Sequence, residues 1–356
     1  MSDEKKDPGM KWVIFANILL VAIMVLLLVA SYFEKIASKN KRQELDNIEK
    51  LESVSSLDDY NNYDFDLKIK PQNCEGVSGD VDIVLITDAN YMDFTRVAIN
   101  SAKETKCPDS VYNFHVMTIA LQDGDKEALE ALKGENVNVR VLEQKQIDLF
   151  YIRDTHVSKA SLLKYYIAEQ LPELDKVLYV DSDILVLHDL NELYKINLGD
   201  NYLAVVKDPS WFFENKHVLE LNLEERGFYF NSGVMLMNLD KIRKDGIIQK
   251  LEDYTNNNFR TYMDQDALNV VVGDKVQLMD VKFNTMNFFF AHNPISKLAE
   301  FYGKDWKSYE DVFSGATIIH FASSKKPLGV EVEKTDFFYM LQKLWYKYYT
   351  PLPKLS

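Results

Sequence analysis

Stretches with the pattern of buried strands alternate with stretches of helical pattern along the middle of this chain. The strand patterns cover 81–87, 114–119, 137–142 and 177–180, and the helical patterns lie around 97–101 and at 127–133 and 160–171. Strands that alternate with helices form a mainly parallel sheet that is covered by helices on both faces. The sequence therefore predicts an α/β domain, and the ligands of such sheets bind beyond the carboxyl ends of the strands.

The composition excludes several other classes of protein. Hydrophobic residues make up 47% of the 356 residues and charged residues 27%, so most of the chain can bury a core. The net charge of −14 argues against nucleic-acid binding, which needs a basic surface. Two cysteines, Cys74 and Cys107, are too few for a disulfide scaffold or a four-thiolate zinc site. They can pair with each other, but we expect two unrelated thiols.

An apolar run without charged residues occupies 12–33. At 1.5 Å per residue it is long enough to cross a hydrocarbon core of roughly 30 Å. Aromatic residues stand at both of its ends, as is typical of membrane interfaces. A cleaved signal peptide is the alternative, but its apolar region is shorter, about 7–15 residues. We therefore expect a retained single-pass membrane helix, preceded by a tail at 1–11 and followed by a polar stalk at 34–78.

The side of the membrane on which the body of the chain lies is weakly indicated. Three lysines precede the apolar run, and three lysines and an arginine follow it, a distribution that slightly favours a cytosolic body. The chain has no Asn-x-Ser/Thr sequon, which lumenal domains often carry. We expect a cytosolic body at 79–330, with a lumenal body as the alternative. An aromatic and basic extension at 331–356 follows, and we expect it to pack on the body.

The strand at 177–180 runs directly into two aspartates, Asp181 and Asp183. Residues two apart in extended backbone point to the same side, so both carboxylates can converge on one cation. Oxygen ligands at a strand end suit Mg²⁺ or Mn²⁺, and an imidazole from His320, which ends another strand-like run, favours Mn²⁺. A solvated turn is the alternative for an Asp-x-Asp pattern, but the apolar strand before it favours a metal site.

Six short motifs occur in order between residues 82 and 327. They are Thr87-Asp-Ala-Asn-Tyr91, Lys164 within Leu-Leu-Lys-Tyr-Tyr-Ile, Tyr179-Val-Asp-Ser-Asp183, Phe230-Asn-Ser-Gly-Val234, Asp264-Gln-Asp266 and His320-Phe-Ala-Ser-Ser-Lys-Lys-Pro327. Together they resemble the family 8 glycosyltransferases, which are retaining enzymes with a GT-A nucleotide-sugar-binding fold. The resemblance implies a Rossmann-like mixed sheet at 79–330. It also implies transfer of a hexose, galactose or glucose, from a UDP-sugar to a glycan or lipid-linked acceptor.

The resemblance assigns roles to individual residues. The residues assigned to metal binding are Asp181, Asp183 and His320. The metal would be Mn²⁺, or alternatively Mg²⁺, and would bridge the diphosphate. Those assigned to the nucleotide sugar are Thr87, Asp88, Asn90, Tyr91, Lys164, Ser182, Ser323 and Lys326. Those assigned to the transfer step are Lys164, Asn231, Asp264 and Gln265, with Gln265 nearest the anomeric carbon. Lys164 stands where many relatives have Arg, Ser323 where a Gly is frequent, and Leu328 where a Trp is frequent.

Two of these motifs also have a purely structural interpretation. Asn231 can be a turn residue that is supported by Gly233. Asp264 and Asp266 can be acidic residues at a helix start, where the helix dipole favours negative charge.

The chemistry of a departing diphosphate agrees with the resemblance. Negative charge develops on the leaving phosphate, and a divalent cation with Lys326 can stabilise it without proton transfer. No separate general base is evident, and the resemblance implies that the leaving phosphate takes the acceptor proton on the same face, with the anomeric configuration retained.

Two other functions compete with the transferase. A catalytically silent nucleotide-sugar sensor or scaffold on the same fold is the first, and the departures at Ser323 and Leu328 allow it. A phosphohydrolase with Asp181 as nucleophile is disfavoured, because such enzymes carry that motif near the start of the domain. The sequence does not specify the donor sugar, the acceptor or the oligomeric state.

Overall fold

The structure is a computed structural model that describes residues 67–143, 159–213, 215–258, 262–323, 326–328 and 336–351. The expected tail at 1–11, the expected membrane helix at 12–33 and most of the expected stalk at 34–78 lie outside the described residues. Within the described ranges, no helix is both long and apolar enough to cross a membrane.

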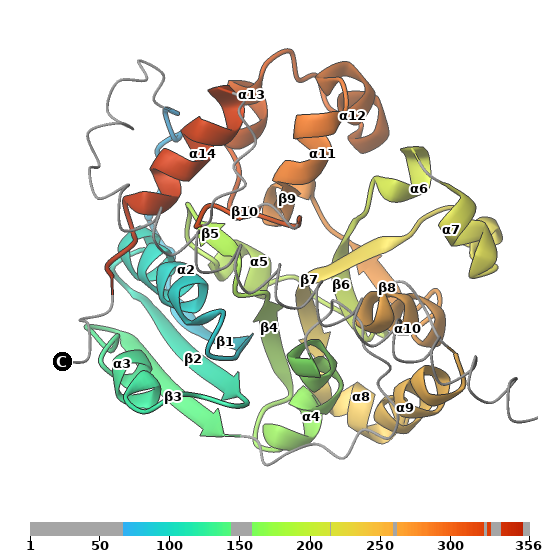
Figure 1. Ribbon diagram of the computed structural model, residues 1–356, viewed down its shortest axis with the longest axis horizontal. Coiled ribbons are helices and arrows are strands. Elements are labelled where there is room, and N and C mark those ends of the chain that lie inside the picture. Colours follow the sequence, from blue (N-terminus) through green and yellow to red (C-terminus); the bar gives the residue numbers. More distant parts are fainter. Residues whose placement is uncertain are drawn as a thin grey trace, which may run out of the picture. The chain divides into compact units, whose positions relative to one another are not determined.

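A seven-stranded sheet forms the centre of the domain, in the order β3-β2-β1-β4-β7-β6-β8 (Figure 1). Its strands are β1 (Gly79–Thr87), β2 (Ser110–Thr118), β3 (Val137–Glu143), β4 (Lys176–Val180), β6 (Leu203–Lys207), β7 (Phe230–Asn238) and β8 (Val276–Leu278). Strand β7 is antiparallel to both of its neighbours, β4 and β6, and the other four pairs are parallel. The expectation of a mixed, mainly parallel sheet is therefore confirmed.

A smaller sheet of three strands carries one of the expected metal ligands. Its strands are β5 (Ile184–Val186), β9 (Thr285–Met286) and β10 (Ile318–His320), with β10 in the middle. Strand β10 is antiparallel to β5 and pairs His320 with Ile184, the residue directly after Asp183. This register brings the end of β10 beside the two aspartates.

Helices surround the two sheets. The α-helices are α2 (Met92–Thr105), α3 (Asp125–Glu130), α4 (Ile167–Gln170), α5 (Asn191–Tyr194), α6 (Ser210–Phe213), α7 (Asn215–Glu220), α8 (Leu239–Lys244), α9 (Ile247–Asn257), α10 (Met263–Val271), α11 (Asn287–His292), α12 (Ile295–Tyr302), α13 (Tyr309–Phe313) and α14 (Asp336–Tyr346). The 3₁₀ helices are η2 (Lys159–Tyr166), η3 (Glu224–Arg226) and η4 (Val281–Phe283).

The central sheet buries both faces because its strands are apolar at successive positions. Ile83 and Leu85 face one core, which includes α2, α5 and the smaller sheet. Val84 and Ile86 face the opposite core, which includes η2, α4, α8, α9 and α10. This alternation follows the two-residue period of a strand. It fixes the register of β1, and so the position of Thr87 and Asp88 at its carboxyl end.

Two expectations about helices have different outcomes. The helix expected at 160–171 is divided into the 3₁₀ helix η2 and the short helix α4. Its apolar face is buried as the pattern indicates, but the hydrogen-bond spacing of the first part is tighter than in an α-helix. The carboxyl-terminal extension packs on the body as expected, and α14 buries Leu341 and Trp345 completely.

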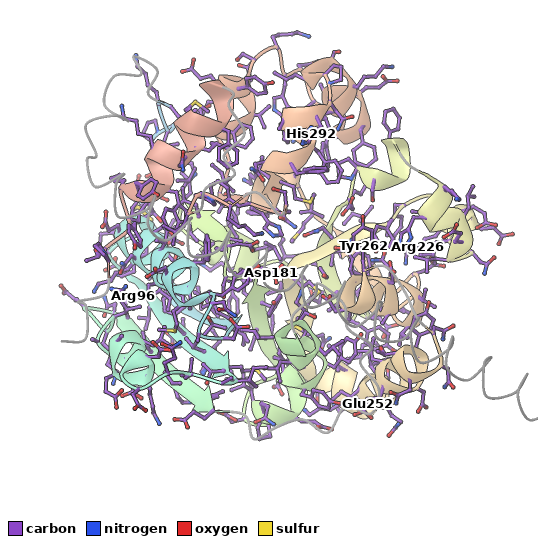
Figure 2. The ribbon with its side chains drawn as sticks, in the orientation of Figure 1. Arg96, Asp181, Arg226, Glu252, Tyr262 and His292 are labelled. Atoms are coloured by element: carbon purple, nitrogen blue, oxygen red, sulfur yellow. A yellow bond between two sulfur atoms is a disulfide. The ribbon has the colours of Figure 1, made fainter. Side chains whose placement is uncertain are left out.

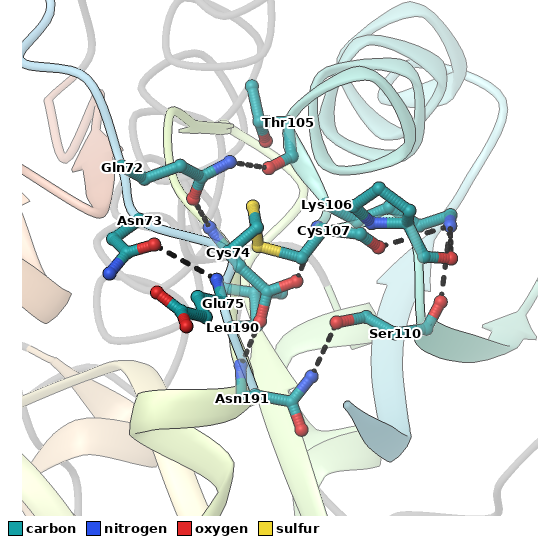
Figure 3. The surroundings of a disulfide bond; sticks show 12 residues. Gln72, Asn73, Cys74, Glu75, Thr105, Lys106, Cys107, Ser110, Leu190 and Asn191 are labelled. Carbon is teal, nitrogen blue, oxygen red and sulfur yellow. Dashed lines mark hydrogen bonds between the residues drawn. A yellow bond between two sulfur atoms is a disulfide. The ribbon is translucent and has the colours of Figure 1, made fainter. Parts of the chain in front are cut away.

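The expectation of two unrelated thiols is wrong, because Cys74 and Cys107 form a disulfide. The bond joins the segment before β1 to Cys107, which lies two residues beyond the end of α2 (Figure 3). The two Cα atoms lie 5.4 Å apart although the residues are separated by 33 positions. Only the path of the chain through β1 and α2 brings them together, so spacing in the sequence could not reveal the pair.

Candidate active site

A cavity of about 360 Å³ opens where several expected site residues meet. It lies beyond the carboxyl ends of β1 and β4, as expected for ligands of this type of sheet. In Figure 2, Asp181 is seen just beyond the end of β4, and Tyr262 at the beginning of α10. The cavity lining combines residues from widely separated parts of the sequence, among them Asp88, Lys164, Asp183, Gln265 and Lys326.

Three expected metal ligands converge in this cavity. One ligand atom each from Asp181, Asp183 and His320 lie within 4.8 Å of one another. The Nε2 atom of His320 is 3.6 Å from Oδ2 of Asp181 and 3.4 Å from Oδ1 of Asp183. Two carboxylates and one imidazole form a donor set that fits Mn²⁺ or Mg²⁺, which keep positions for water or phosphate.

Asn284 fixes the orientation of the His320 ring. Its Nδ2 donates to the side chain of Asn231, so its Oδ1 faces Nδ1 of His320 at 3.0 Å. With the proton on Nδ1, the lone pair of Nε2 points toward the two carboxylates. Metal-binding histidines commonly hold their second nitrogen in this way. No local pattern around Asn284 indicates this role.

Gly233 lies against two of the expected metal ligands, His320 and Asp181, and has no room for a side chain. A Cβ atom there would be 2.2 Å from Cε1 of His320 and 2.8 Å from Oδ2 of Asp181. The carbonyl oxygen of Gly233 also accepts a hydrogen bond of 2.7 Å from the Asp181 amide. The alternative in which Asn231 and Gly233 belong to a turn is wrong, because both lie in β7. The glycine is needed for close approach of this strand.

Lys164 lies between two carboxylates rather than at the surface. Its Nζ is 2.7 Å from Oδ2 of Asp264 and 3.1 Å from Oδ1 of Asp181, and it donates to Ser232 at 3.3 Å. Burial lowers the pKa of this ammonium group, but the two carboxylates outweigh burial and hold the pKa above its usual range. The residue therefore carries a permanent charge that links the metal ligands to the residues expected to face the sugar.

Lys326 contacts one of the expected metal ligands, Asp183. It forms an ion pair with Oδ2 of Asp183 and donates to the carbonyl of Phe321 at 2.7 Å. Burial raises the pKa of the Asp183 carboxyl group, but Lys326 and His320 outweigh burial and hold the pKa well below its usual range. A phosphate that binds a cation at this cluster would therefore meet the Lys326 ammonium group.

The residues expected to act in transfer form one hydrogen-bonded group. Oε1 of Gln265 accepts from Nδ2 of Asn231 at 2.9 Å and from the Ser232 amide at 3.0 Å. Its Nε2 donates to the buried Asp208 at 3.3 Å, and burial raises the pKa of that carboxyl group. Because both ends of the amide are held, Gln265 has a single defined orientation at the cavity wall.

The interpretation of the Asp264-Gln-Asp266 motif as a helix start is also correct. Asp264 and Asp266 stand in the first turn of α10, where the helix dipole favours them. Asp266 is fully buried and accepts hydrogen bonds from Tyr229 and the Tyr262 amide. Asp264 lines the cavity. Asp266 therefore supports the fold, and Asp264 belongs to the candidate site.

The residues expected to bind the nucleotide are only partly gathered in the cavity. Thr87, Asp88, Tyr91, Ser182, Ser323 and Lys326 line it. Asn90 is exposed outside the lining, and its amide donates to the Asp88 carboxylate at 2.9 Å, which shapes the turn after β1. The Ser182 hydroxyl donates to the carbonyl of Ile86 and accepts from Thr95, so it joins β1 to α2.

The cavity also contains residues that the sequence analysis did not select. Tyr179 precedes Asp181 by two positions, and strand periodicity could have placed it on the same side. Ser161 and Tyr262 also line the cavity, and Tyr262 is 50% exposed. No local pattern distinguishes these two from ordinary surface residues.

The arrangement of the two sheets and their helices defines a fold of the GT-A type. The crystal structure of a galactosyltransferase, LgtC, in complex with donor and acceptor sugar analogs has a TM-score of 0.61 with this chain. It is 24% identical, and the match covers 77% of this chain and 98% of that one. This likeness supports the fold.

Sequence comparison assigns the family. The model of glycosyl transferase family 8 matches residues 82–327, and the chain belongs to this family. General stress protein A of Bacillus subtilis is 25% identical over 206 residues, which cover 54% of this chain and 69% of that protein. Lipopolysaccharide 1,3-galactosyltransferase of Salmonella typhimurium is 28% identical over 210 residues, which cover 56% of this chain and 61% of that protein. The family and these relatives support the expected hexosyltransferase.

Proposed function

We propose that this chain is a retaining, metal-dependent glycosyltransferase that moves a hexose, galactose or glucose, from a UDP-sugar to a glycan or lipid-linked acceptor. The observation that carries the proposal is the cluster of Asp181, Asp183 and His320 beside Lys326 in one cavity. The name of the Salmonella relative supports the hexose, and the sugar analogs bound to LgtC support a donor and an acceptor sugar.

The cluster would hold Mn²⁺, with Mg²⁺ as the alternative. A divalent cation bound there supplies electrostatic stabilisation to the leaving diphosphate. Lys326 would add a second positive charge beside the phosphate oxygens, where a preorganised charge stabilises the leaving group more than it would in bulk water. Thr87, Asp88 and Tyr91 would then contact the nucleoside from the end of β1.

The remaining residues would orient the transferred sugar. Lys164 neutralises Asp264, so that this carboxylate can accept hydrogen bonds from sugar hydroxyls without the full cost of a buried free charge. Gln265 and Asn231 hold each other at the cavity wall and would face the anomeric carbon. The departing phosphate takes the acceptor proton on the same face, which retains the anomeric configuration.

The proposal includes attachment to a membrane through the apolar run at 12–33. An anchored catalytic domain would meet lipid-linked acceptors at the membrane surface. The net charge of −14 argues against broad nucleic-acid binding, for which a basic surface is expected.

The test is a donor screen with the full chain, in which UDP release from UDP-hexoses is measured with and without Mn²⁺. We expect slow metal-dependent release without acceptor, loss of release in Asp183→Asn, and normal release in Asp189→Asn, a largely buried aspartate outside the cavity. Failure to bind or turn over any nucleotide sugar with metal present would refute the proposal. Tight metal-dependent UDP binding without turnover would instead identify a silent sensor. An inverted anomer in the first product, seen by NMR, would reject retention.

A further inference from the structure

Tyr179 is a buried tyrosine directly behind the cluster that is proposed to bind the metal. It lies in β4, two residues before Asp181, and only 2% of it is exposed. Its hydroxyl donates to Oδ1 of Asp181 at 2.5 Å. The strand therefore carries both the carboxylate and the group that holds it.

The two oxygens of the Asp181 carboxylate have different surroundings. Oδ1 accepts from Tyr179 and is 3.1 Å from Nζ of Lys164. Oδ2 faces His320 and would be 2.8 Å from a Cβ atom at Gly233. One oxygen is thus fully occupied by the protein, and the other is directed at the place where the three ligand atoms meet.

Lys164 alone cannot fix this orientation. Its ammonium group is shared with Asp264 at 2.7 Å and with Ser232 at 3.3 Å, and it also lies 5.1 Å from the centre of the Tyr179 ring. Without the tyrosine hydroxyl, Asp181 could rotate and place both oxygens toward Lys164. The hydrogen bond from this hydroxyl is directional and therefore opposes the rotation.

We propose that Tyr179 is a positioning residue that holds Oδ1 of Asp181, so that Oδ2 is available to the cation. This inference rests on the proposed metal-dependent function. Hydrogen-bond partners behind metal ligands orient them, and removing such a partner typically weakens metal binding about 10–100-fold.

The test is Mn²⁺ titration of the full chain, followed by the EPR signal of free Mn²⁺. Tyr179→Phe keeps the buried ring and removes only the hydroxyl, and we expect Mn²⁺ affinity to fall about 10–100-fold. Saturating Mn²⁺ should restore most of the turnover. Tyr112→Phe is the matched control, because Tyr112 is also fully buried and donates to an aspartate, Asp189, at 3.0 Å outside the cavity. Its Mn²⁺ affinity should stay within about twofold of wild type.

The outcomes separate the inference from the function on which it rests. If the wild-type chain binds no Mn²⁺, the proposed function fails and the inference fails with it. If wild type binds Mn²⁺ and Tyr179→Phe binds it equally well, the positioning role alone is overturned. It is also overturned if both tyrosine variants lose affinity to the same extent, or if saturating Mn²⁺ restores no turnover.

A second inference comes independently from the disulfide and concerns the compartment of the domain. Cys107 is buried, and the segment around Cys74 is held by hydrogen bonds on both sides (Figure 3). Gln72 donates to the carbonyl of Thr105 at 2.5 Å and accepts from the Asp189 amide at 2.7 Å. These contacts hold the two cysteines in bonding position.

The same segment is fastened at a second point. The Lys70 amide donates to the carbonyl of Ser314 at 2.9 Å, and its own carbonyl is 2.8 Å from Nε2 of His188. Leu67 and Ile69 pack against the core that contains α14. The segment 67–77 is therefore part of the folded domain. Both cysteines of the disulfide lie in segments that pack on this domain.

We infer that the catalytic domain folds and works in an oxidising compartment rather than in the cytosol. Disulfides form and persist in oxidising compartments and are rare where cytosolic reductants keep thiols reduced. When this bond forms, the two thiols lose two protons and two electrons. A protein disulfide oxidant accepts them by thiol–disulfide exchange and is itself reduced to a dithiol. The weak preference for the cytosol from the flanking lysines is thereby reversed.

The test traps the thiols of the full chain in its own cells. Cells are quenched with acid, the protein is denatured, and free thiols are alkylated with a maleimide reagent that adds visible mass. We expect no added mass without reductant and two additions after reduction, whereas Cys74→Ser should show one addition without reductant. Two additions to the wild-type chain without reductant would overturn the inference. This experiment needs neither metal nor nucleotide, so it does not depend on the proposed function.

Discussion

The substitution Gly233→Ala should destroy the metal site while leaving the fold in place. The new Cβ would lie 2.2 Å from Cε1 of His320, whereas carbon atoms in contact are about 3.5 Å apart or more. The imidazole would have to move by roughly 1 Å. Ligand distances in metal sites hold to about 0.2 Å, so His320 could no longer act as a ligand together with both aspartates.

The size of the effect follows from the burial of the site. His320 is 3% exposed and is held by Asn284 at 3.0 Å, so it has little space into which to retreat. We expect Mn²⁺ binding to weaken at least about 100-fold, which corresponds to about 2.7 kcal/mol. Overpacking should also lower the free energy of unfolding by about 1–3 kcal/mol.

The assay is calorimetric titration with Mn²⁺ at a temperature where circular dichroism shows both proteins folded. Gly315→Ala is the control, because a Cβ there meets only the Lys70 side chain, at 3.8 Å and beyond. The control should bind Mn²⁺ like wild type. A folded Gly233→Ala protein that binds Mn²⁺ within threefold of wild type would refute the reasoning.

Three further predictions concern stability. Lys164→Met leaves the buried carboxylate of Asp264 and the partly exposed carboxylate of Asp181 without their cation. It should lower the free energy of unfolding in urea by about 3–5 kcal/mol, and a variant as stable as wild type would contradict this. The double variant Cys74→Ser/Cys107→Ser loses a crosslink over 33 positions, worth about 3–4 kcal/mol by chain entropy, so calorimetry should show a clearly lower Tm rather than an unchanged one. Burial raises the pKa of Asp189, but hydrogen bonds from its neighbours outweigh burial and lower it. The depressed pKa contributes stability that is present above about pH 4 and is lost as the pH falls further. The Tm of Asp189→Asn should therefore fall less steeply at low pH than that of wild type. Equal slopes of Tm against pH would contradict this contribution of Asp189.

Four strands of the central sheet, β1 to β4, were predictable because their signals are local, whereas β6, β7 and β8 were not predicted. Val84 and Ile86 alternate with Ile83 and Leu85, and both sets are apolar, which is the pattern of a strand that is covered on both faces. The position of Asp181 at the end of β4 followed from the same pattern. His320 was proposed as the third ligand because it ends another strand-like run, and the resemblance supported that choice.

The features that escaped prediction depend on contacts between distant segments. Gly233 looks like a turn residue until β7 is placed against the metal ligands. The pairing of Cys74 with Cys107 depends on the return of the chain through β1 and α2. Asn284 can be identified only from its contact with the His320 ring that it orients. In each case the cause is a neighbour that is far away in sequence.

The most direct test of the central claim is calorimetric titration of UDP into the full chain with and without Mn²⁺. If Asp181, Asp183 and His320 hold a cation that binds the diphosphate, wild type should bind UDP tightly only with Mn²⁺, and His320→Ala should lose this dependence together with the affinity. Equal UDP affinity with and without Mn²⁺, or unchanged metal-dependent binding in His320→Ala, would contradict the account.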